Sequence, residues 1–249
     1  MEPKIVKRML ITGASSGVGK IMTEYFSKDY HVIVAARRID RLNKYFGKYD
    51  NISIYGVDLS DPDDVENFSK KLILKFGYIP YLINNAGVKL DGEIADLSLN
   101  DLRDSFQVNA LSPFILIKSL LPEMKVKNFG RIINVTSGAP FNCFPNVGAY
   151  SASKAALNAL TVTAARENTS FNIKINLMSP GPVKSEMSPD SNLNPEICLS
   201  TAKYLLELKE TDSTGKFFWL GYEIPLFPNL EGVNWLKGDA NSKFKKVFE

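Results

Sequence analysis

Short segments rich in β-branched residues alternate with longer helical segments along most of this 249-residue chain. This alternation restricts the fold more than any other feature, because parallel strands need crossover connections and these are usually helices. Strands are predicted over residues 6–12, 31–36, 52–57, 81–84, 131–136, 174–178 and 217–220, and helices over residues 18–28, 38–46, 62–76, 99–125, 150–169 and 195–208. The order predicts an α/β fold with a doubly wound parallel sheet flanked by helices.

The chain shows no internal repeat, low-complexity linker or change of composition that would divide it. We therefore expect a single domain over residues 1–249, with a core at about 6–221 and a C-terminal extension at about 222–249. Within the long helix predicted over residues 99–125, Pro113 removes one backbone donor and should kink the helix near Ala110.

Charge and hydropathy exclude several classes of partner. Thirty Lys and Arg residues against 27 Asp and Glu residues give a net charge of +3, with no basic block that could follow a phosphate backbone. The longest apolar run, residues 110–121, is interrupted by Pro113 and Lys118, and the apolar run near the N-terminus is too short for a signal peptide. We expect a cytoplasmic protein that binds neither nucleic acid nor membrane.

The chain has a single histidine, His31, and two cysteines, Cys143 and Cys198. This set offers no zinc-ligand spacing, and two distant cysteines are more consistent with free thiols than with a disulfide framework. His31 begins a predicted strand, whereas ligands of open parallel sheets gather at the carboxyl ends of the strands. A metal centre and a histidine-based catalytic triad are therefore not expected.

A glycine-rich turn follows the first predicted strand and opens the first predicted helix. Its residues are Gly13, Ser15, Ser16, Gly17, Val18 and Gly19. Glycine permits a sharp turn and a close approach to backbone N–H groups, and the helix N-terminus favours an anion. The turn is predicted to hold the pyrophosphate of a dinucleotide, although a tight turn without a ligand would need similar glycines.

The second predicted strand ends at Ala36 and is followed by Arg37 and Arg38, with no acid before Asp40. A carboxylate at this position would accept from a ribose 2′-OH, whereas arginine accommodates a 2′-phosphate. The sequence predicts a preference for NADP(H), with NAD(H) still possible and Arg37 as the first candidate. The alternative is that both arginines are merely exposed at a helix start.

Tyr150 and Lys154 lie four residues apart at the start of a predicted helix, so their side chains share one face. A nearby cation should lower the pKa of the phenol, which could then exchange a proton with a carbonyl or alcohol oxygen, while the lysine could also hold a ribose. Ser137 follows another strand and could polarise the same oxygen. In a chain with ten tyrosines the spacing alone could arise by chance, and Ser137 could be an ordinary turn residue.

The order of these motifs resembles the single-domain branch of the short-chain dehydrogenase/reductase family over about residues 9–220. The resemblance implies a Rossmann fold with seven parallel strands and a catalytic tetrad of Asn109, Ser137, Tyr150 and Lys154. Asn109 would anchor a water in the proton relay. The resemblance also adds cofactor contacts at Asp58, Leu59, Asn85, Ala86, Gly87, Pro180, Gly181, Val183 and Ser185.

The resemblance implies hydride transfer between NADP(H) and a small carbonyl or alcohol substrate, and a homodimer or homotetramer. We expect a carbonyl reductase, with a 3-oxoacyl thioester reductase as the nearest alternative. A sensor or scaffold that binds NADP(H) without turnover is an alternative of another class. The short, polar loop over residues 186–195 argues against a large steroid.

Overall fold

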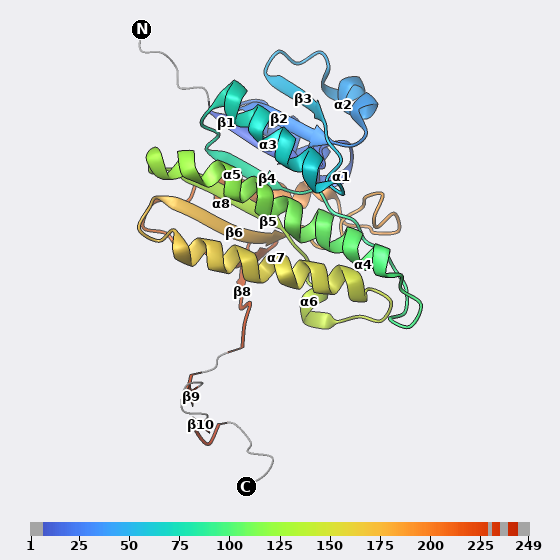
Figure 1. Ribbon diagram of the computed structural model, residues 1–249, viewed down its shortest axis with the longest axis vertical. Coiled ribbons are helices and arrows are strands. Elements are labelled where there is room, and N and C mark those ends of the chain that lie inside the picture. Colours follow the sequence, from blue (N-terminus) through green and yellow to red (C-terminus); the bar gives the residue numbers. More distant parts are fainter. Residues whose placement is uncertain (1–6, 229–230, 235–238, 244–249) are drawn as a thin grey trace.

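The computed structural model describes residues 7–228, 231–234 and 239–243. Its sheet contains the strands β1 (Arg8–Thr12), β2 (His31–Ala36), β3 (Ile52–Gly56), β4 (Tyr81–Asn84), β5 (Gly130–Val135), β6 (Ile173–Ser179), β7 (Phe217–Trp219) and β8 (Tyr222–Ile224). The helices are α1 (Gly17–Phe26), α2 (Ile39–Phe46), α3 (Pro62–Phe76), α4 (Leu99–Phe106), α5 (Ser112–Val126), α6 (Ala139–Asn142), α7 (Gly148–Glu167) and α8 (Leu199–Leu206). The predicted α/β architecture is confirmed (Figure 1).

The strands lie in the order β3-β2-β1-β4-β5-β6-β7-β8. The seven strands β1 to β7 are parallel as predicted, but β8 adds an eighth strand that runs antiparallel to β7. The chain first extends the sheet from β1 towards β3 and then crosses back to β4. This reversal opens a crevice at the carboxyl ends of β1 and β4, which is where doubly wound sheets bind ligands.

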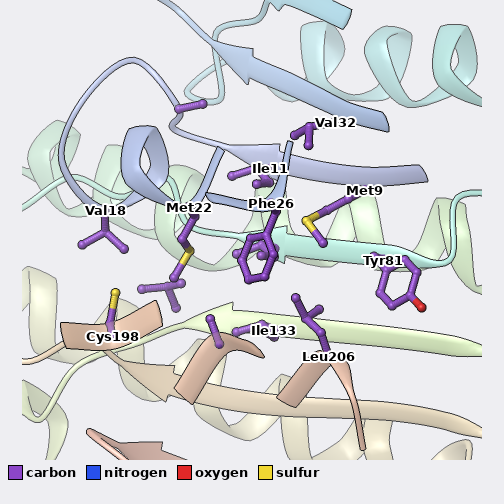
Figure 2. Packing of buried hydrophobic residues seen from close by; sticks show 14 of the residues in the cluster. Met9, Ile11, Val18, Met22, Phe26, Val32, Tyr81, Ile133, Cys198 and Leu206 are labelled. Atoms are coloured by element: carbon purple, nitrogen blue, oxygen red, sulfur yellow. The ribbon is translucent and has the colours of Figure 1, made fainter. Parts of the chain in front are cut away.

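Alternate residues of each buried strand pack on opposite faces of the sheet. Met9 and Ile11 of β1 join Phe26 of α1 and Leu206 of α8 in one cluster, shown in Figure 2. Leu10 faces the other way into a second cluster with residues of α3 and α5. Figure 1 shows α3, α5 and α7 across this second face. Two packed layers of helices therefore hold the strand ends, and hence the crevice, in place.

The long helix predicted over residues 99–125 is interrupted where the proline suggested. Between α4 and α5, η1 (Gln107–Leu111) forms a π-helical turn that contains Asn109 and Ala110, and Pro113 follows in the first turn of α5. Insertions of this kind are frequent at functional sites. None of the helices in the described residues is long and apolar enough to span a bilayer.

The start of the predicted C-terminal extension is part of the sheet. Leu220 and Gly221 both have positive φ and connect β7 to β8 in a tight hairpin. Beyond it, β9 (Val233–Asn234) and β10 (Asp239–Ala240) form a separate two-stranded sheet. Val6, Trp235 and much of the remaining extension lie outside the described residues.

Candidate active site

A cleft of about 1270 Å³ lies along the carboxyl ends of the parallel strands. Nearly every residue that the sequence analysis selected lines it. They are Gly13, Ser15, Ser16, Gly17, Val18, Arg37, Arg38, Asp58, Leu59, Asn85, Ala86, Gly87, Ser137, Tyr150, Lys154, Pro180, Gly181, Val183 and Ser185. His31 lies outside this cleft, with its Nε2 atom 2.9 Å from Ser53 Oγ.

Two selected residues, Gly19 and Asn109, lie behind the cleft wall rather than in it. A Cβ atom on Gly19 would come within 2.4 Å of both the Asn85 side chain and the Gly13 carbonyl oxygen. Gly19 therefore allows α1 to pack closely on the loop after β4, and a direct cofactor contact by this residue remains a prediction.

The glycine-rich turn is held in a fixed shape by the end of β4. Gly13 and Gly17 have φ values of +71° and +51°, which L-residues with side chains rarely adopt. The Asn85 side chain donates to the Thr12 carbonyl at 3.0 Å, and the Asn85 backbone N–H donates to Thr12 Oγ1 at 3.1 Å. Asn85 therefore positions the turn as well as lining the cleft.

The N-terminus of α1 has no side-chain cap. Ser16 occupies the capping position but makes no hydrogen bond to the helix backbone, and the first turn contains no acidic residue. Instead, Arg38 donates from Nη2 to Ser16 Oγ at 2.9 Å and from Nε to Ser15 Oγ at 3.2 Å. Free helix N–H groups beside a guanidinium form a suitable site for a phosphate group.

The part of the cleft around Arg37 and Arg38 also carries acidic groups. Asp58 accepts from the hydroxyl and backbone N–H of Ser60 at 2.7 and 3.0 Å. Burial acts to raise the pKa of Asp58, but these hydrogen bonds and the charge of Arg37 hold it below its usual value. Glu186 pairs with both Arg38, at 2.6 Å, and Arg41. The sequence analysis missed this contact, because the two partners lie 145 or more positions from Glu186.

Buried hydrogen bonds connect the central strands to α7, which carries Tyr150 and Lys154. Asn84 on β4 donates to Asn134 on β5 at 2.8 Å, and Asn134 donates to Thr161 on α7 at 2.7 Å. Asn84, Asn134 and Thr161 are each 2% exposed or less. Because unpaired buried amides are costly, these hydrogen bonds fix α7 against the strand ends.

Lys154 is buried beside the cleft, and its Nζ atom donates to the Val135 carbonyl at 2.8 Å. This Nζ atom lies 6.0 Å from the centre of the Tyr150 ring. A Cβ atom on Gly87 would lie 3.2 Å from Asn109 Oδ1 and 3.5 Å from Lys154 Nζ. The absence of a side chain at Gly87 thus allows the loop after β4 to approach both residues.

The Asn109 side chain is committed to holding neighbouring elements. Its Oδ1 atom accepts from the Val88 N–H at 2.9 Å, and its Nδ2 atom donates to the Val88 carbonyl and to Ser153 Oγ, both at 2.9 Å. Asn109 therefore joins the π-helical turn to the loop after β4 and to α7. The predicted water-anchoring role remains a prediction.

The expectation that Lys154 lowers the pKa of Tyr150 is wrong for this structure. Burial raises the pKa of the Tyr150 phenol, and a hydrogen bond with Ser137 only partly opposes this. Burial also lowers the pKa of Lys154 to about 8. The low-polarity surroundings disfavour the charged form of each group. Tyr150 is consequently held in its neutral, proton-bearing form at neutral pH.

Several apolar residues line the cleft that the sequence analysis did not select. They are Val88, Leu90, Phe141, Phe144, Val147, Phe217, Trp219 and Ile224. Trp219 ends β7, the last parallel strand, so its position at a carboxyl end was a usable signal, whereas Phe217 begins that strand. Phe141 and Phe144 belong to the segment around α6, a helix that was not predicted. The thiol of Cys143 in this segment is exposed and free, and that of Cys198 is buried and free, as expected.

Comparisons with known proteins agree with this geometry. Residues 7–196 match the family model described as short chain dehydrogenase. The chain is 30% identical over 187 residues to the 3-oxoacyl-[acyl-carrier-protein] reductase FabG of Thermotoga maritima, covering 73% of this chain and 76% of that protein.

Two solved structures share the fold and contain a nicotinamide cofactor. A 4-hydroxyisoleucine dehydrogenase complexed with NADH superposes with a TM-score of 0.81 at 28% identity, covering 86% of this chain and 96% of that one. ElxO with NADP bound gives a TM-score of 0.78 at 28% identity, covering 87% and 97%. With the family model matching most of the sequence, the chain belongs to the short-chain dehydrogenase family of oxidoreductases.

Proposed function

We propose that the protein is an NADP(H)-dependent carbonyl reductase. The observation that carries this proposal is the grouping of Tyr150, Ser137 and Lys154 in the same cleft as the uncapped turn at α1 and the guanidinium of Arg38. A nicotinamide dinucleotide bound there would supply a hydride to the carbonyl carbon of the substrate. The relatives support a nicotinamide cofactor, since one solved structure has NADH bound and another has NADP bound.

The chain's own groups would handle the substrate oxygen. Tyr150 holds its proton at neutral pH, because burial raises its pKa, and it can donate that proton as the oxygen gains charge. Ser137 would donate a second hydrogen bond to the same oxygen. Lys154 would compensate the charge left on Tyr150 and contact the ribose of the cofactor. The reverse reaction would use Tyr150 as the base.

The resemblance to FabG favours a 3-oxoacyl thioester as the second candidate substrate. The test is a thermal-shift titration with NADPH and NADH, followed by NADPH consumption with simple ketones, aldehydes and a 3-oxoacyl thioester. We expect binding of NADPH and turnover of at least one carbonyl class. Tight binding of NADPH with no turnover of any class would favour a cofactor sensor instead.

The expected homodimer or homotetramer remains a proposal. Phe114 on α5 and Leu160 on α7 are 44% and 37% exposed, and Leu111 at the end of η1 is 44% exposed. Apolar side chains at the surface of neighbouring helices are consistent with a subunit contact.

Replacing Arg37 with aspartate is expected to lower the ratio of NADPH affinity to NADH affinity. Arg37 is exposed at the end of β2 and lines the cleft, so it can pair with a 2′-phosphate. A charge-assisted hydrogen bond contributes about 1.5–3 kcal/mol, which corresponds to a change of roughly tenfold to more than a hundredfold. Titration of both cofactors measures the ratio, and an unchanged ratio would remove Arg37 from the recognition of the phosphate.

Replacing Glu186 with glutamine is expected to strengthen NADPH binding and to leave NADH binding nearly unchanged. Glu186 neutralises Arg38 and Arg41, so a 2′-phosphate must compete with its carboxylate for the same guanidinium groups. The pairs are partly exposed, and a gain of about two- to fivefold is therefore expected. The same titration in low and high salt measures the effect, which should shrink as salt is added. An equal gain for NADH would contradict this competition.

A further inference from the structure

The substrate side of the cleft contains a group of apolar side chains that the proposed chemistry does not use. The group comprises Phe141, Phe144, Met187, Trp219 and Ile224, which we call the apolar wall. Phe141 and Phe144 lie between Ser137 and Tyr150 in the sequence, and all four residues line the same cleft. Met187 comes from the loop after β6, and Trp219 and Ile224 come from the β7–β8 hairpin.

Contacts between these elements hold the wall in place. The rings of Phe141 and Phe217 pack edge to face, with their centres 5.3 Å apart, and so join α6 to β7. A Cβ atom on Gly181 would lie 3.1 Å from Trp219 Nε1, so the indole rests against the turn at Pro180 and Gly181. Phe141 and Trp219 therefore have fixed neighbours, and the wall lines the same cleft as Tyr150.

The wall is exposed to solvent in the structure. Phe141, Met187 and Trp219 are each 41–42% exposed, and Phe144 is 58% exposed. Large apolar side chains grouped in a cleft are typical of a ligand-binding surface, because a ligand that covers them removes apolar area from water.

Most charged side chains in the described part of the cleft are engaged by other groups of the protein, and the carboxylate of Asp104, which also lines it, would repel an anionic substrate. Arg38 and Glu186 pair with each other near the glycine-rich turn, and Asp58 accepts from Ser60. Lys89, on the loop after β4, also lines the cleft, and its ammonium group pairs with Asp91 at 2.7 Å. None of the five members of the apolar wall carries a charge.

We infer that the substrate is an uncharged ketone or aldehyde with an aromatic or alkyl substituent, which packs against the apolar wall while its carbonyl oxygen faces Tyr150 and Ser137. This inference rests on the proposed function and names its substrate class. Sugars would leave their hydroxyl groups facing apolar side chains, and keto acids would have to separate Lys89 from Asp91.

The test compares three ketones that differ only in one substituent: 4-phenyl-2-butanone, 4-hydroxy-2-butanone and 4-oxopentanoate. The phenyl ketone is expected to have a kcat/KM about ten- to a hundredfold higher than the hydroxy ketone, from burial of the ring. The carboxylate is expected to react more slowly still. Replacing Trp219 with alanine should lower kcat/KM for the phenyl ketone about tenfold, mainly through KM, and Trp219→Phe should restore most of it.

Tyr204→Ala serves as the matched control, because Tyr204 is an aromatic residue, 55% exposed, that lies outside this cleft. It should leave all three substrates unchanged. Tyr150-dependent turnover with no preference for the phenyl ketone would overturn the inference and leave the proposed function intact. A preference for 4-oxopentanoate that disappears in Lys89→Met would also overturn the inferred substrate class and leave the proposed function intact. No turnover of any of the three, despite cofactor binding, would count against both.

Discussion

Replacing Tyr150 with phenylalanine is expected to lower the kcat of carbonyl reduction by about 10²–10⁴-fold, which corresponds to roughly 3–5 kcal/mol of barrier. The variant removes only the hydroxyl, which lines the cleft, carries its proton at neutral pH and is the group proposed to protonate the substrate oxygen. Ser137 could still donate a hydrogen bond to the substrate oxygen but would not readily give up a proton. Stopped-flow or steady-state consumption of NADPH measures the loss.

Two further measurements separate a chemical effect of Tyr150→Phe from a structural one. The ring stays in place, so cofactor affinity and the melting temperature should remain close to those of the unaltered protein. Ser137→Ala should reduce kcat less, because Ser137 orients the oxygen without supplying the proton. Turnover that persists in Tyr150→Phe would remove the phenol from the mechanism, whatever the effect of Ser137→Ala.

The parts of the site that could be predicted are those encoded in neighbouring residues. The turn from Gly13 to Gly19 directly follows a strand and opens a helix, so its place in the fold follows from local pattern. Tyr150 and Lys154 lie one helical turn apart, and their shared face follows from helix geometry. The position of Ser137 after a buried strand placed it at the same edge of the sheet.

The parts that could not be predicted depend on distant residues. Strand β8 was missed because its hairpin uses Leu220 at a φ of +47°, and leucine gives no signal for such a turn. The pairing of Glu186 with Arg38 spans 148 positions, and the apolar wall collects residues from α6, the loop after β6 and the β7–β8 hairpin. The direction of the Tyr150 pKa shift was wrong because it depends on burial, which the spacing to Lys154 does not reveal.

Replacing Lys154 with methionine is expected to lower kcat/KM by at least about a hundredfold, because the variant removes the buried cation beside Tyr150 while filling a similar volume. The replacement should also change how cofactor affinity depends on pH.

In the unaltered protein, burial lowers the pKa of Lys154 to about 8. The ammonium form is therefore already present below pH 8, and cofactor affinity should not change with pH there. Above pH 8 the protein must take up a proton to present the cation, so affinity should fall as pH rises. Steady-state NADPH consumption measures the loss of kcat/KM, and cofactor titration from pH 6.5 to 9.5 measures the pH dependence of affinity.

Lys174→Met is the matched control for Lys154→Met. Lys174 is also buried, donates from Nζ to the Glu210 carbonyl at 2.6 Å, and has a pKa lowered by burial, but it lies outside the cleft. Its replacement should leave turnover and the decline of cofactor affinity above pH 8 unchanged. In Lys154→Met the decline of cofactor affinity above pH 8 should disappear. The pKa values of Asp58 and Glu186 are lowered, so both stay ionised from pH 6.5 to 9.5. The pKa of Tyr150 is raised, so the phenol stays neutral over the same range. If the decline survives in Lys154→Met, another group is responsible, and Lys154 does not bind the cofactor through its charge.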